Sequence, residues 1–118
     1  MPRGRILCVS FDKTVSESRC FALREAGYDV VATTNIQEAF NQLDQIKFDL
    51  VIVGHRFEKL DKQTLISEAR QRWHTPVVLM CGASPDSELE ADARVFAIQG
   101  TDGLLEAVAK LMRGAVAA

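Results

Sequence analysis

The chain has 118 residues, of which 47% are hydrophobic and 25% are charged, and this composition is typical of one globular domain. Its formal net charge of −2 provides no strong field to attract nucleic acid or anionic lipid, so we expect neither as a direct partner. The apolar run near the N-terminus, residues 6–9, is too short for a signal-peptide core or a membrane span. We therefore expect a cytoplasmic protein.

The chain contains three cysteines, Cys8, Cys20 and Cys81. Their odd number and the absence of a CxxC or Cys/His ligand spacing argue against both a disulfide framework and a zinc site. We expect small buried or half-buried thiols and no bound metal.

In the first half of the chain, strand-like apolar runs alternate with helix-like spacing. Thr14 with Glu17, and Asn35 with Glu38, have the spacing of a capping box that opens a helix. Gly27 is suited to a left-handed helix stop. The expected elements are strands at 5–9, 28–32 and 48–53 and helices at 14–26 and 36–46.

The same alternation continues in the second half. Pro76 restrains the residue before it from helical geometry, and Ser84 followed by Pro85 predicts the start of a short helix. Asp102 is a candidate cap for the last helix, and the spacing of Trp73 favours packing in the core over an exposed anchor. The expected elements are helices at 62–72, 84–92 and 102–112 and strands at 77–81 and 94–98.

Five strands that alternate with five helices predict an α/β fold, an open and doubly wound parallel sheet with helices on both faces. We expect one domain over residues 3–112 and a frayed tail at 113–118. The working site of such a sheet lies beyond the carboxyl ends of the strands. The residues at those ends are Ser10, Phe11, Asp12, Gly54, His55, Arg56, Phe57, Cys81, Gly82, Ala83, Gln99 and Gly100.

The order of the segments ILCVS, LREAGYDVVATTNIQEAF, FDLVIV, TPVVLM and LLEAVAKLM resembles the receiver (CheY-like) domain of two-component response regulators. The most specific stretch is 23–40, where this family commonly shows a leucine, a Gly-Tyr, a valine and a Glu-Ala at the same spacings. The resemblance implies the flavodoxin-like strand order 2-1-3-4-5 and a role in phosphorelay signal transduction. It implies no enzymatic activity of the domain itself.

The resemblance also implies a phosphorylation pocket, and this chain departs from it. Receivers take up the phosphoryl group on an aspartate at the end of the third strand, and that position falls on Gly54. They hold Mg²⁺ with an acidic pair after the first strand, which aligns with Ser10 and Phe11. Asp12 alone provides a carboxylate nearby, and one ligand without an acceptor does not make a phosphotransfer site.

Two further positions of the pocket also lack the residue type that the resemblance implies. The switch hydroxyl after the fourth strand aligns with Cys81, and the lysine after the fifth aligns best with Gln99. We therefore predict a degenerate receiver, without catalytic residues, metal or cofactor, that acts as a phosphorylation-independent interaction module. It would bind a protein partner or a second copy through its fourth and fifth helices and its fifth strand.

A binding site for a small ligand, flavin or other anion in the strand-end crevice is the alternative. Against it, the residues after the first strand, SFDKT, form no glycine-rich phosphate loop. His55 and Arg56 are candidate anion contacts, although solvated surface groups are the more common outcome for isolated loop charges. Cys81 as a redox sensor is likewise weighed against a buried structural thiol, which is favoured.

A third possibility is that another aspartate has become the phosphoacceptor. Asp12 follows the first strand, whereas Asp49 opens the third strand at the end opposite the site. Asp49 is therefore badly placed for this role.

Overall fold

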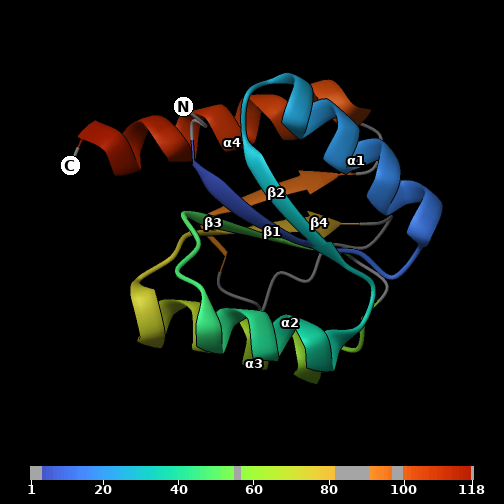
Figure 1. Ribbon diagram of the computed structural model, residues 1–118, viewed down its shortest axis with the longest axis vertical. Coiled ribbons are helices and arrows are strands. Elements are labelled where there is room, and N and C mark those ends of the chain that lie inside the picture. The colour runs from blue at the N-terminus through green and yellow to red at the C-terminus, as the bar shows by residue number, and fades with distance from the viewer. Residues whose placement is uncertain (1–3, 55–56, 82–90, 97–99, 118) are drawn as a thin grey trace.

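The computed structural model describes the chain over residues 4–54, 57–81, 91–96 and 100–117, with side chains up to 112 in the last helix. Figure 1 shows a three-layer arrangement in which α1 and α4 cover one face of a central sheet, and α2 and α3 cover the other. The elements are β1 (Arg5–Val9), α1 (Lys13–Glu25), β2 (Asp29–Thr33), α2 (Ile36–Gln45), β3 (Leu50–Val53), α3 (Lys59–Trp73), β4 (Val77–Cys81), β5 (Ala93–Phe96) and α4 (Gly100–Ala117).

The sheet has five parallel strands in the order β2-β1-β3-β4-β5. Val9 at the end of β1 pairs with Thr33 of β2 on one side and with Val53 of β3 on the other. The predicted fold class and strand order are therefore confirmed. Because all strands run in the same direction, their carboxyl ends meet at one edge.

The third strand, at the centre of the sheet, is apolar on both faces. All four of its residues are buried, and their side chains alternate between the two faces. Leu50 and Ile52 belong to the core cluster under α1 and α4, whereas Val51 and Val53 belong to the cluster over α2 and α3. Two separate cores thus hold the strand ends in place.

The start of α1 corrects one expectation. Asp12 is the N-cap, and its Oδ1 accepts hydrogen bonds from the backbone N–H groups of Thr14 at 2.8 Å and Val15 at 3.2 Å. The prediction that Thr14 caps this helix together with Glu17 is wrong. The carboxylate two residues earlier already satisfies the first free amides, so the helix begins at Lys13.

The carboxyl-terminal end of α1 has the structure expected from Gly27. Gly27 has a positive φ of 100°, and its N–H donates to the carbonyl of Arg24. The N–H of Tyr28 donates to the carbonyl of Leu23, which completes a Schellman motif. The predicted left-handed stop is confirmed.

Asn35 caps α2 as predicted. Its Oδ1 accepts from the N–H of Gln37 at 2.8 Å and of Glu38 at 3.2 Å. The backbone N–H of Asn35 donates to Thr33 Oγ1 at 3.1 Å, so Thr33 takes the place that the capping box gives to Glu38.

The third helix is longer than the predicted 62–72. It spans Lys59–Trp73 and follows Glu58, whose side chain makes no capping hydrogen bond. At its other end His74 adopts the left-handed conformation with φ 54°, and its N–H donates to the carbonyl of Arg70 at 3.0 Å. This helix therefore stops at His74, two residues before Pro76.

Trp73 is neither fully packed in the core nor a fully exposed anchor. Its side chain is 38% exposed, and its indole N–H donates to the carbonyl of Leu43 at 3.1 Å. The tryptophan therefore ties the end of α3 to α2 while one edge faces solvent.

Most of the helix expected at 84–92 lies outside the described residues. Its last two residues, Ala91 and Asp92, are described and are not helical. Asp92 instead pairs with the first residue of β4: its carboxylate accepts from the N–H of Val77 at 2.7 Å, and its own N–H donates to the carbonyl of Val77 at 2.9 Å. These two bonds hold Asp92 beside the start of β4, and β5 begins at the next residue.

The last two elements are shifted from their expected bounds. The fifth strand is Ala93–Phe96, and residues 97–98 of the predicted strand lie outside the described part. The last helix begins at Gly100, two residues before the predicted cap Asp102. It continues through 113–117, the segment for which frayed ends were expected.

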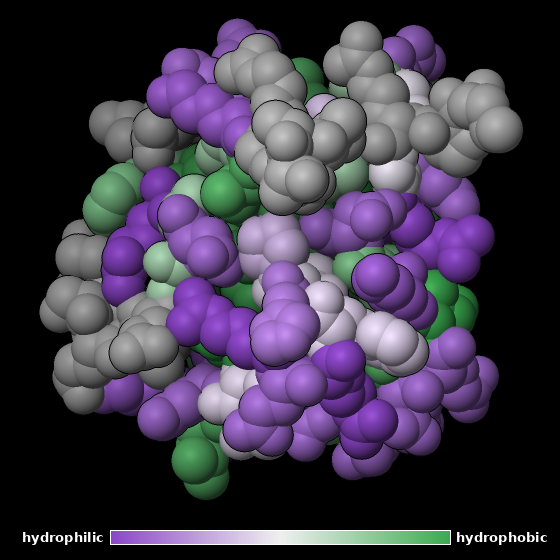
Figure 2. Space-filling model, turned by 90° about the vertical axis from the view of Figure 1, so that its left-hand side faces the viewer, coloured by the Kyte–Doolittle hydropathy of each residue, from purple (hydrophilic) through white to green (hydrophobic). Residues whose placement is uncertain are grey.

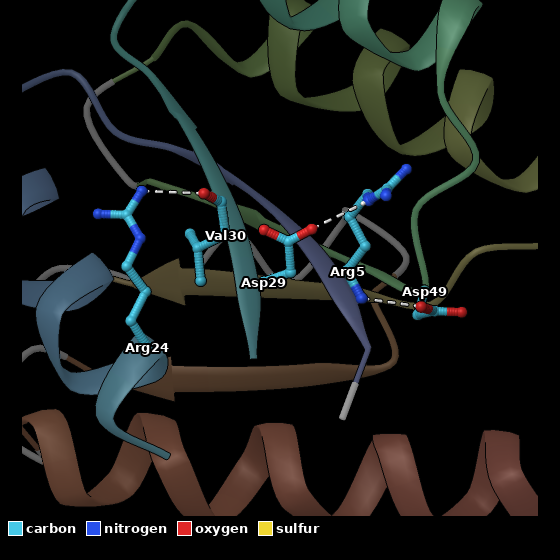
Figure 3. Close-up of polar contacts among 5 residues, drawn as sticks. All are labelled: Arg5, Arg24, Asp29, Val30 and Asp49. Atoms are coloured by element: carbon cyan, nitrogen blue, oxygen red, sulfur yellow. Dashed lines mark hydrogen bonds and ion pairs between the residues drawn. The ribbon is translucent and has the colours of Figure 1, made fainter. Parts of the chain in front are cut away.

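The amino edge of the sheet is held by polar contacts, which Figure 3 shows. The backbone N–H of Arg5 donates to Asp49 Oδ2 at 2.8 Å, and its side-chain Nε lies 3.3 Å from Asp29 Oδ2. Arg24 Nη2 donates to the carbonyl of Val30 at 2.9 Å. Asp49 is thus engaged at the edge opposite Gly54, which argues against it as a phosphoacceptor.

The surface at this amino edge is mainly hydrophilic. Figure 2 shows it with hydrophobic side chains only in small, separate areas. Within the described part of the chain, no helix combines the length and apolarity needed to cross a membrane.

Candidate functional site

The carboxyl edge of the sheet is closely packed around Gly54. This residue follows β3 directly, is buried, and donates its N–H to the carbonyl of Val9 at 2.8 Å. A Cβ atom added at Gly54 would lie 3.2 Å from the Val9 oxygen and 3.4 Å from Ser10 Cα. The ends of β1 and β3 therefore leave little room for a side chain at this position.

Ser10 lies inside the site. It is almost completely buried, and its backbone N–H donates to the carbonyl of Thr33 at 3.0 Å. Its hydroxyl oxygen accepts a hydrogen bond from Arg19 Nη1 at 3.0 Å and lies 3.7 Å from Cys8 Sγ. Ser10, at the first position of the expected acidic pair, is therefore neutral, and its hydroxyl oxygen binds the guanidinium of Arg19.

Arg19 brings a positive charge to this edge from α1. Its Nη1 lies 3.8 Å from the position that a Cβ on Gly54 would take. Burial lowers the pKa of Arg19, whereas the neighbouring thiols of Cys8 and Cys20 act in the opposite direction. The guanidinium thus occupies the space beside the residue that aligns with the phosphoacceptor.

Arg19 was not among the residues predicted for the site. A signal was available, because Arg19 follows the buried Ser16 by three residues and precedes the buried Leu23 by four. Those spacings place the three residues on neighbouring parts of one helix face. An arginine at the border of an apolar stripe is ordinarily a solvated group, however, so spacing alone did not single it out.

Phe11 and Asp12 do not supply metal ligands. Phe11 is 59% exposed, and its ring packs edge-on against Phe57, with ring centroids 5.9 Å apart. The Asp12 carboxylate is bound to the first amide groups of α1. A phosphate group at this helix start would meet a carboxylate that already occupies the amides, which argues against a flavin or nucleotide phosphate site here.

The Mg²⁺ implied by the receiver resemblance does not fit these residues. Magnesium prefers carboxylate oxygens and water in octahedral geometry, and Ser10, Phe11 and Gly54 offer no carboxylate. Across the part of the chain that the structure describes, no cluster of three or more His, Cys, Asp or Glu side chains could hold a metal ion.

The remaining predicted positions are only partly described. Cys81 is buried, and its Sγ donates to the carbonyl of Leu79 at 3.8 Å, as a structural thiol does. His55, Arg56 and Gln99 lie outside the described residues.

Two other thiols lie next to the site, Cys8 in β1 and Cys20 in α1, and both are free. A hydrogen bond from Cys8 lowers the pKa of Cys20 to about 6, and Ser16, Arg24 and Arg19 act in the same direction against burial. The hydrogen bond to Cys20 and burial raise the pKa of Cys8. The two shifts run in opposite directions, so we expect Cys20 to lose its proton at a lower pH than Cys8.

We expect one thiol of the folded protein to titrate near pH 6 in thiolate absorbance. The Cys20→Ser variant should lose this titration, and the matched Cys81→Ser variant should keep it. The pKa of Cys20 is depressed from 9.0 to about 6, so the unfolded chain holds a proton that the folded chain has lost between these values. The stability that Cys20 contributes should be complete above about pH 9 and lost as the pH falls through about 6. A wild-type thiol titration that begins only above about pH 8, as for an ordinary cysteine, would contradict this assignment.

The chain was compared with known proteins. No family model matches it. Solved structures do match: a response regulator from Thermotoga maritima is 28% identical, with 96% of this chain and 98% of that chain covered and a TM-score of 0.79. A CheY-like response regulator receiver domain protein from Methanospirillum hungatei is 19% identical, with 94% of each chain covered and a TM-score of 0.83.

A response regulator receiver protein from Sinorhizobium medicae is 21% identical, with 94% of this chain and 95% of that chain covered and a TM-score of 0.83. These structural neighbours are receiver domains of the CheY-like, flavodoxin-like fold, and the sheet described above has the same strand order. The fold that the sequence resemblance implied is therefore confirmed.

Proposed function

We propose that this chain is a receiver-like domain of a signalling system that works by binding a protein partner or a second copy, without being phosphorylated. Its fold supports a role in signal transduction, because its structural neighbours are response regulator receiver domains. The domain itself would carry out no chemical step. Its expected location is the cytoplasm, where two-component response regulators act.

One observation carries the proposal: among the described residues, an arginine and not a carboxylate lies beside Gly54 at the end of β3. Phosphoryl uptake needs a carboxylate that attacks phosphorus and a metal ion that neutralises the charge. At this edge Gly54 has no side chain, and the Arg19 guanidinium lies beside it, bound to Ser10. This arrangement supports recognition as the remaining means of signalling.

The proposed binding surface is formed by α4, which is the fifth helix of the sequence prediction, together with β5 at the edge of the sheet; most of the predicted fourth helix, 84–92, lies outside the described residues. Glu106 and Lys110 are largely exposed on α4 and form an i,i+4 pair at 3.7 Å. An exposed pair of this kind contributes little to stability, so both charges remain available to a partner.

The first test is incubation with acetyl phosphate and Mg²⁺, followed by intact-mass measurement. We expect no phosphate-sized gain in mass, under conditions in which a receiver with its aspartates becomes phosphorylated. A gain that disappears in the Asp12→Asn variant would overturn the proposal, because Asp12 would then act as the acceptor.

The second test asks whether binding depends on α4 and not on phosphate. The tagged chain is used to capture partners or its own second copy from the source cells, with and without acetyl phosphate. We expect capture to be insensitive to acetyl phosphate and to be lost in the double variant Glu106→Lys with Lys110→Glu. The Gln45→Lys variant on α2, on the opposite face of the sheet, is the matched control. Capture that requires acetyl phosphate would contradict the proposal.

A further inference from the structure

A cavity of about 310 Å³ opens between α1 and the start of α4. Arg19 and Ser18 line it from α1, and Gly100 and Thr101 line it from the first turn of α4. Its volume lies at the lower end of the range found for small-molecule sites. Of the described positions singled out by the receiver resemblance, Gly100 lines it, and Gly100 stands next to the expected lysine position, Gln99, which lies outside the described residues.

Arg19 is the charged residue among the described residues that line the cavity. Its guanidinium has five N–H donors, and its hydrogen bond goes to the neutral hydroxyl of Ser10. Across the residues that the structure describes, no carboxylate lies within ion-pair distance of it. The thiol of Cys20, whose pKa is lowered to about 6, also lies near Arg19. A half-buried arginine with spare donors at a cavity wall is suited to an incoming anion.

The rest of the wall defines what kind of anion fits. Val15, Met80 and Leu104 form an apolar side, and the hydroxyls of Ser18 and Thr101 add polar groups. One guanidinium matches the two oxygens of one carboxylate, and the apolar side suits a short hydrocarbon or aromatic body. Asp102 follows the lining residue Thr101 in the first turn of α4, and its negative charge opposes a doubly charged phosphate more than a singly charged carboxylate.

We propose that this cavity binds a small organic monocarboxylate, with Arg19 holding the carboxylate group and the apolar wall holding the body of the ligand. The site shares Arg19 with the strand-end edge at Gly54, and its other described walls come from α1, β4 and α4. It does not depend on the proposed interaction role, because the domain could dock a partner with or without such a ligand. A ligand here would contact both α1 and α4, and would therefore join the two helices of one layer.

The test uses benzoate as the probe, with isosteric, uncharged benzamide as its control. Two-dimensional NMR of the full chain should show saturable shifts at Arg19 and Thr101 with benzoate, at a Kd of about 1 mM for so small a ligand. Benzamide should bind at least about tenfold more weakly, because it cannot form the charged pair. Inorganic phosphate should not compete.

Variants on α1 distinguish binding at this cavity from general effects of a substitution on the fold. Arg19→Gln should weaken benzoate binding about tenfold or more, whereas the matched Arg24→Gln, on the same helix but outside the cavity, should leave it unchanged. Arg19→Lys keeps the charge and should retain part of the affinity if Arg19→Gln disturbs folding. Val15→Phe should reduce binding by filling the cavity. Equal binding of benzoate and benzamide, an unaffected Arg19→Gln variant, or no saturable shift would each overturn the proposal.

Discussion

Replacing Leu79 with alanine is expected to lower the free energy of unfolding by about 3 to 4 kcal/mol. Leu79 is 0% exposed in β4 and belongs to the core cluster that includes Leu43 of α2 and Leu65 of α3. Truncation removes apolar contacts and leaves a cavity that a sheet held on both faces cannot close by collapse. This is the largest loss of stability that we predict.

The measurement is chemical unfolding, with the midpoint shifted and the denaturant dependence unchanged. Leu60→Ala is the matched control, because the same substitution is made at a side chain that is 71% exposed. Its effect should stay within about 0.5 kcal/mol. Equal losses at the two positions would mean that α2 and α3 do not pack on the sheet as described.

Gly54→Asp is expected to create an ion pair with Arg19 and still not to create a phosphorylation site. A Cβ at this position lies 3.8 Å from Arg19 Nη1, so an aspartate carboxylate would come within reach of the guanidinium. That pairing would occupy the new carboxylate, and Ser10 and Phe11 would still provide no carboxylate ligands for Mg²⁺. Incubation with acetyl phosphate and Mg²⁺ should therefore give no gain in mass.

A double-mutant cycle isolates the new pair. Gly54→Ala is the matched control, because it tests the tight 3.2 Å contact with the Val9 carbonyl without adding a charge. We expect a coupling energy of about 1 to 2 kcal/mol between the introduced carboxylate and Arg19, measured against Arg19→Gln. A coupling near zero, or uptake of phosphate by Gly54→Asp alone, would show that Arg19 does not control this edge of the sheet.

The fold was predicted well from local sequence patterns, because each of these patterns spans only a few residues. Continuous apolar runs indicated the buried strands, and Gly27 and Asn35 marked helix ends through backbone conformation and capping. The start of α1 was mistaken because Asp12 and Thr14 are both good cap residues, and only the chain path after β1 decides between them. The extra turn of α3 lacks any side-chain cap at Glu58 and so carried no signal.

The site was harder to predict, since its main group comes from another element. The described positions Ser10 and Gly54 lie at the carboxyl edge as expected, but the side chain beside Gly54 belongs to Arg19, in the second turn of a helix. Its approach to Ser10 depends on how α1 lies across β1. Packing of this kind is a tertiary property that helical spacing alone does not determine.

The contact between Arg19 and Ser10 has a consequence for how such a domain would be regulated. A phosphoryl group is added and removed by other proteins, so a receiver that uses one reports how active those proteins are at a given moment. The guanidinium of Arg19 is part of the polypeptide from the time of synthesis and is held in place by a neighbouring hydroxyl. Under the proposed role, the strength of the output would follow the number of copies in the cell, and transcription and proteolysis would be its natural controls.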